Sequence, residues 1–202
     1  MSVRSILPGV HTFAKFSEEK QLDFNGWHVA VGGTFVLIDP PEASDEDVEV
    51  LRSLGAPTKI LITNKDHRRA APHFRDTFGA PIAVSGLDRE LMDCSVDETF
   101  NSGDRLFGEL EVIGIPWSKS PGESALFWRR RRVLFLGDAL IGKPAGSLSL
   151  LPPVKFKEPD KAPMGLEPLR KLEVDAVLVG DGVSVLEGGS AAIAAFLAHA
   201  RA

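Results

Sequence analysis

Four times along this chain of 202 residues, a short apolar run ends abruptly in a cluster of polar or glycine residues. The clusters occupy residues 64–69, 118–123, 137–138 and 180–182. Open α/β sheets carry their sites at the carboxyl ends of strands. We therefore expect several strand ends to meet at one edge of a sheet-based fold and to place these side chains around a shared cleft.

Apolar and β-branched runs predict the strands, and apolar residues at helical spacing predict the helices. The predicted strands are 9–16, 27–31, 34–38, 59–63, 82–84, 110–115, 125–128, 133–136 and 176–179. The predicted helices are 45–54, 70–78, 87–92, 166–172 and 190–202. Residues 142–163 hold five of the 14 prolines and lack periodicity, so we predict a loop that covers and partly gates the cleft.

Each half of the chain runs from strands into strand–helix units. This order predicts an α+β or α/β domain built as an αββα sandwich, in which two mixed sheets pack face to face with helices outside. A length of 202 residues suits a single domain, which we place at 1–202.

Composition excludes several functional classes. The net charge of −5 argues against a nucleic-acid partner, and the four arginines at 129–132 are interpreted as a solvated turn. Cys94 is the one cysteine, which rules out a disulfide framework and any CxxC motif. No apolar run reaches 18 residues, so we expect no membrane partner and predict a cytoplasmic protein. A homo-oligomer is left open.

The order of the four clusters resembles the metallo-β-lactamase fold superfamily over nearly the whole chain. In that family a strand ends in Thr-His-x-His-x-Asp-His, and Thr63 opens the corresponding segment here. Residues 116–118 match the family's Pro-Gly-His turn, 134–138 its Leu-Phe-x-Gly-Asp strand end, and 180–182 its Gly-His-Gly turn. The resemblance implies the αββα fold and, as the family default, hydrolysis at a two-zinc site.

The metal ligands of that family are mostly replaced in this chain. In the register of the resemblance, its seven ligand positions correspond to Asn64, Asp66, Ser118, Arg68, Arg69, Asp138 and Asp181. Only Asp138 keeps the family's residue type, and an arginine stays protonated and cannot bind a metal. The resemblance therefore implies no metal and no cofactor. The alternative is a single hard cation, such as Mg²⁺ or Mn²⁺, held by Asp66, Asp138 and Asp181.

Two functions from different classes follow. The first is a non-catalytic protein whose cleft binds a small anionic molecule, with the candidate ligand-binding residues Asn64, Lys65, Arg68, Arg69, Ser118 and Lys119. The second is a hydrolase of an ester, thioester, lactone or phosphoester, with the candidate catalytic residues Asp66, His67, Asp138 and Asp181. Whether the chain is an enzyme stays open at this point.

Several of these residues also have a purely structural interpretation. Asn64 is a good helix cap, and Asp66 would then be a first-turn acid favoured by the helix dipole. His67 would pack at the wall of the cleft, and Glu123 would lie on the surface of a turn.

Three converging aspartates cannot all stay ionised without a nearby positive charge, because like charges raise one another's pKa. Arg69 stands where the family has a ligand of the second metal. We therefore predict that its guanidinium takes the electrostatic place of that metal and pairs with Asp181, Asp138 or both. Arg68 is predicted to point outward.

Overall fold

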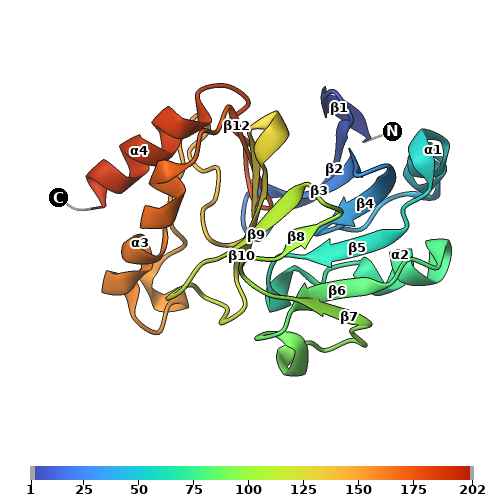
Figure 1. The fold of residues 1–202 in the computed structure, drawn as a ribbon, viewed down its shortest axis with the longest axis horizontal. Coiled ribbons are helices and arrows are strands. Elements are labelled where there is room, and N and C mark those ends of the chain that lie inside the picture. The colour runs from blue at the N-terminus through green and yellow to red at the C-terminus, as the bar shows by residue number, and fades with distance from the viewer. Residues whose placement is uncertain (1–2, 201–202) are drawn as a thin grey trace.

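Two β-sheets pack face to face, with helices on their outer faces, in the computed structural model, which describes residues 3–200 (Figure 1). The first sheet runs in the order β1 (Arg4–Leu7), β2 (Val10–Ser17), β3 (Leu22–Val31), β4 (Thr34–Ile38), β5 (Lys59–Ile62), β6 (Ile82–Ser85) and β7 (Glu98–Phe100). The second runs in the order β12 (Ala176–Val179), β11 (Val133–Leu136), β10 (Ser124–Trp128), β9 (Leu110–Gly114) and β8 (Arg105–Leu106).

Both sheets are mixed. Strands β1 to β4 pair antiparallel and β4 to β7 pair parallel, while in the second sheet only β11 and β12 pair parallel. The predicted αββα sandwich is confirmed. Three of the clusters predicted to form the site follow directly on β5, β11 and β12.

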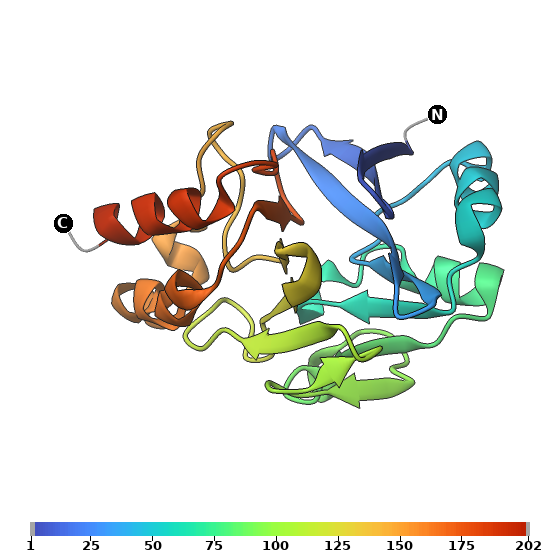
Figure 2. The same ribbon diagram turned by 45° about the horizontal axis from the view of Figure 1, so that its top comes forward.

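Apolar side chains fill the space between the sheets and beneath the helices. Trp27 of the first sheet and Phe135 of the second meet edge to face, with ring centroids 6.1 Å apart. Helices α1 (Asp45–Gly55) and α2 (Ala71–Phe78) cover the first sheet, and α4 (Gly189–His199) covers the second (Figure 2). Most of the buried ionisable side chains within residues 3–200 lie instead at the edge where β4, β5, β11 and β12 end.

The segment 87–92 is not the predicted helix. It forms only a 3₁₀ turn, η2 (Arg89–Leu91), because Asp88 does not cap a helix. Its buried carboxylate instead accepts from the backbone N–H of Lys65 at 2.8 Å and of Gly122 at 2.7 Å. Asp88 thus ties two of the polar clusters together.

Other differences concern short or terminal elements. The edge strands β1, β7 and β8 were not predicted, because four, three and two residues are too few for a periodic pattern. The last two residues of the predicted helix 190–202 lie outside the described residues. No helix within residues 3–200 has the length and apolar character needed to cross a bilayer. The predicted cytoplasmic location stays a prediction.

The segment 142–163 is irregular, as predicted, but contains the 3₁₀ turns η4 (Pro153–Lys155) and η5 (Pro159–Lys161) and the start of α3 (Ala162–Gly165). Its Lys143 ammonium donates to the carbonyl of Lys20 at 3.0 Å, and Lys20 lines the cleft. The segment itself contributes no residue to the cleft lining. Gating by this loop stays a prediction.

Candidate functional site

A cavity of about 270 Å³ lies where β5, β11 and β12 end. Its lining consists of Lys20, Phe24, Asp66, His67, Arg69, Lys119, Asp138 and Asp181. Of the ten predicted site residues, Asp66, His67, Arg69, Lys119, Asp138 and Asp181 line it. These six residues follow the ends of different strands, so the predicted convergence of strand ends is present in the structure. Asn64 and Lys65 immediately precede Asp66 in the chain.

Asn64 acts as a cap and not as a group that faces the cavity. The residue is fully buried after β5, and its side-chain oxygen accepts from the backbone N–H of Asp66 at 2.9 Å. This bond starts the 3₁₀ turn η1 (Lys65–His67). The turn then presents Asp66 and His67 from adjacent positions at the end of the strand.

His67 is a buried imidazole between two carboxylates. Its Nδ1 lies 2.8 Å from Asp39 Oδ2, and its Nε2 lies 3.3 Å from Asp138 Oδ1. Burial and the nearby Arg69 charge disfavour the imidazolium, but Asp39 and Asp138 outweigh both and raise the pKa of His67 to about 10. His67 is therefore protonated on both nitrogens at neutral pH and donates to both acids.

Asp39 contacts both Thr63 and His67. It is buried, and it accepts from the Thr63 backbone N–H at 2.8 Å and from the Thr63 hydroxyl at 2.6 Å. The oxygen that accepts from the hydroxyl also faces His67 Nδ1. The strand end at Thr63 and the ring of His67 are thereby fixed by one carboxylate.

The Arg69 guanidinium lies inside the cluster, where it was predicted to lie. Nη2 donates to Asp181 Oδ1 at 2.5 Å and to the carbonyl of Gly180 at 3.2 Å. Nη1 donates to the carbonyl of Asn25 at 2.8 Å, and the guanidinium stacks on Phe24 at 4.9 Å from the ring centroid. Only 10% of the side chain is exposed, so this is a mostly desolvated ion pair.

The Lys119 ammonium bridges two aspartates. It lies 2.8 Å from Asp138 Oδ2 and 3.1 Å from Asp66 Oδ2, and Lys65 meets the other oxygen of Asp66 at 2.9 Å. Burial alone would raise the pKa of Asp138, but His67 and Lys119 outweigh it and hold that pKa well below its usual range. Asp138 is therefore ionised and engaged from both sides.

The cluster contains as many acidic as basic side chains. Its carboxylates are Asp39, Asp66, Asp138 and Asp181, and its cations are Lys65, His67, Arg69 and Lys119. Behind them lies Glu123, which is buried and not at the turn surface as predicted. Burial and the Asp138 charge raise the pKa of Glu123 well above its usual value.

The residues present do not fit the metal ions that the fold implies. One ligand atom each from His67, Asp138 and Asp181 lies within 4.8 Å of the others, which is close enough to surround an ion. However, Arg69 donates to Asp181, and Lys119 donates to Asp138. A metal ion bound there would have to compete with these two cations for the carboxylate oxygens.

Four of the six predicted ligand-binding residues, namely Asn64, Lys65, Arg68 and Ser118, do not line the cavity. Arg68 does not line the cavity and pairs instead with the exposed Asp93 at 2.7 Å. Ser118 is half-buried and is not among the residues that line the cavity.

Three residues of the site were missed from the sequence. Asp39 follows directly on β4, and Lys20 and Phe24 belong to the turn and strand of the β2–β3 hairpin. Asp39 follows an apolar strand, as the four recognised clusters do, so the same rule could have found it. Lys20 and Phe24 carry no such signal, because only the folded hairpin brings them over the cavity.

The fold and this edge site define a metallo-β-lactamase-like sandwich, and the comparisons with known proteins agree. The sequence matches the metallo-beta-lactamase superfamily over residues 3–199, so the chain belongs to that superfamily. No curated protein matches it.

Solved structures share the fold at low identity. A metallo-beta-lactamase from Pontibacter korlensis superposes with a TM-score of 0.78 at 16% identity, covering 98% of each chain. A metallo-beta-lactamase family protein from Thermus thermophilus gives 0.74 at 17% identity, covering 98% of this chain and 81% of that one. A flavo di-iron protein from Thermotoga maritima gives 0.76 at 17%, covering 98% and 62%.

Proposed function

We propose that this protein binds a small anionic molecule in the cleft and that side-chain cations take over the role that metals have in other members of the fold. The observation that carries the proposal is the placement of Arg69 and Lys119 against Asp181 and Asp138. With both acids engaged by side-chain cations, binding a metal ion for hydrolysis would require these ion pairs to break.

The charge at the cavity mouth favours an anion. The lining carries four cations, namely Lys20, His67, Arg69 and Lys119, against the three carboxylates of Asp66, Asp138 and Asp181. The surplus charge belongs to the exposed Lys20, whose ammonium lies 5.9 Å from the centroid of the Phe24 ring. Its charge acts on Asp181 from a distance, but it forms no direct ion pair within residues 3–200. A phosphate or carboxylate group could pair there without disturbing the buried network.

Hydrolysis by water activated at Asp66 and His67 has less support. A general base must have a free lone pair, and both nitrogens of His67 are protonated at neutral pH. Lys65 and Lys119 oppose the effect of burial and lower the pKa of Asp66, which makes its carboxylate a weak base. Absence of turnover on generic ester and phosphoester substrates is the expected result.

We expect Lys20→Gln to reduce the stabilisation that anions give to the protein. The measurement is the rise in melting temperature with inorganic phosphate and with a panel of small carboxylates and phosphorylated metabolites. Lys171→Gln is the matched control, because Lys171 is also exposed but does not line the cleft. If no anion raises the melting temperature of the wild type, or if both variants lose the rise equally, the proposed anion site is wrong.

A further inference from the structure

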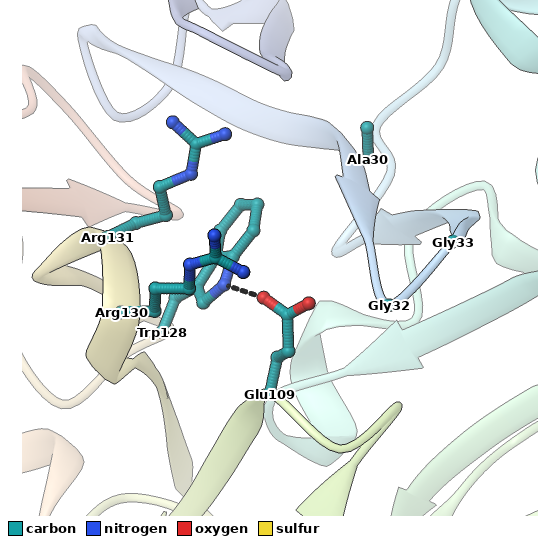
Figure 3. A pocket seen from close by; sticks show the side chains of 7 residues that line it. All are labelled: Ala30, Gly32, Gly33, Glu109, Trp128, Arg130 and Arg131. Atoms are coloured by element: carbon teal, nitrogen blue, oxygen red, sulfur yellow. Dashed lines mark hydrogen bonds between the residues drawn. The ribbon is translucent and has the colours of Figure 1, made fainter.

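A second cavity, of about 480 Å³, lies at the opposite end of the strands from the cleft. It is bordered by the β3–β4 turn and by the β10–β11 turn, which precede β4 and β11, whereas the cleft lies beyond the carboxyl ends of β5, β11 and β12. Its lining consists of Ala30, Gly32, Gly33, Glu109, Trp128, Arg130 and Arg131 (Figure 3).

The wall that the first sheet contributes has almost no side chains. Gly32 and Gly33 form a hairpin turn with φ values of 57° and 77°, a conformation that favours glycine, and Ala30 adds a single methyl group. Across the gap, Figure 3 shows Arg130 and Arg131 extending from the opposite turn. One wall of the cavity is therefore mostly backbone, and the opposite wall carries guanidinium groups.

The four consecutive arginines of this turn are not equally neutralised. Arg129 pairs with Glu111 at 2.7 Å, and Arg132 pairs with Asp175 at 3.0 Å. Arg130 and Arg131, the two that line the cavity, have no carboxylate partner within residues 3–200. Carboxylates therefore offset the positive charge at the two ends of the turn. In the described part of the chain, the exposed guanidinium groups of Arg130 and Arg131 at the cavity remain unpaired.

The one carboxylate in the lining is already engaged. Glu109 accepts from Trp128 Nε1 at 2.6 Å, and the Arg131 guanidinium lies 5.4 Å from the centroid of the Trp128 ring. Two positive charges thus face this cavity against one negative charge whose oxygen is bound to an indole. A negatively charged ligand would neutralise the excess positive charge at this cavity.

We propose that this cavity binds a small diphosphate-bearing molecule, in which Arg130 and Arg131 each bind one phosphoryl group. A guanidinium presents its N–H groups as a fork that matches phosphate oxygens, so two adjacent arginines suit two linked phosphoryl groups. The volume of 480 Å³ is typical of small-molecule sites. The net charge of −5 would repel the many phosphates of a long nucleic acid, so a compact ligand fits this cavity better.

The test is calorimetric titration of the intact protein with inorganic pyrophosphate at physiological ionic strength. We expect the double variant R130Q/R131Q to weaken binding about tenfold or more, since charge-assisted bonds to both phosphoryl groups are lost. R132Q is the matched control from the same turn. Its side chain is paired with Asp175, so binding should change by about twofold or less.

A second readout separates this site from the cleft. Trp128 is one of three tryptophans, and W128F identifies its indole N–H resonance. Pyrophosphate should shift that resonance in the wild type and in K20Q, but not in R130Q/R131Q. No shift, a shift that survives in R130Q/R131Q, equal loss in R132Q, or tighter binding of a single-stranded oligonucleotide than of pyrophosphate would overturn the proposal.

Discussion

Arg69→Ala should destabilise the protein by about 3 to 5 kcal/mol, which is the usual cost of removing one partner from a buried ion pair. The change leaves Asp181 without its guanidinium partner while its side chain stays buried, since only 6% is exposed. It also removes the donor to the carbonyls of Gly180 and Asn25. Urea unfolding followed by circular dichroism measures the loss.

Arg68→Ala is the matched control for Arg69→Ala. It removes the same charge from the adjacent position, but the Arg68 side chain is 36% exposed and its partner Asp93 is 70% exposed. Exposed ion pairs contribute about 0 to 1 kcal/mol, so the melting temperature should hardly change. Equal losses in the two variants would show that the Arg69 guanidinium does not hold the site together.

Asp39→Asn should destabilise the protein by about 3 to 5 kcal/mol as well, and it should lower the pKa of His67. Asparagine tolerates the positive φ of 48° at this position, so the backbone is not the cause. The asparagine NH2 group would replace an accepting oxygen, so it would face either the Thr63 backbone N–H or the Thr63 hydroxyl and His67 Nδ1. Urea unfolding and an NMR titration of the His67 ring measure the two effects.

Asp39→Asn should also change how the free energy of unfolding depends on pH. The pKa of His67 rises from 6.5 to about 10 on folding, so its charge contributes stability that is fully present below pH 6.5. That contribution is lost as the pH rises through 10. Without the Asp39 charge the folded pKa falls, and the alkaline loss should shrink. An unchanged pH slope in Asp39→Asn would contradict the proposed role of Asp39.

Much of the fold was predictable from the sequence, because its strands are short apolar runs that end in polar residues. The same rule placed Asp66, Asp138 and Asp181 at one edge, and the structure brings them together around His67, Arg69 and Lys119. The register of the resemblance also distinguished Arg69 from Arg68, since the predicted metal replacement fell on Arg69 and the outward orientation on Arg68.

The rest depended on geometry that a sequence does not contain. The protonation of His67 arises from Asp39 and Asp138, which are 28 and 71 residues away along the chain. The arginine turn is exposed, as predicted, but the sequence did not indicate that the pairing of Arg129 and Arg132 leaves two guanidinium groups facing a cavity. Neither feature follows from local pattern, because each depends on which strands lie side by side.

The metal content of the protein tests the central claim most directly. The protein is purified without chelator, dialysed against zinc and then against metal-free buffer, and analysed for zinc by elemental mass spectrometry. If Arg69, Lys119 and protonated His67 occupy the site, the protein should retain far less than one zinc ion per chain and its melting temperature should not rise with zinc. Retention of two zinc ions per chain, lost on Asp138→Ala, would contradict this account.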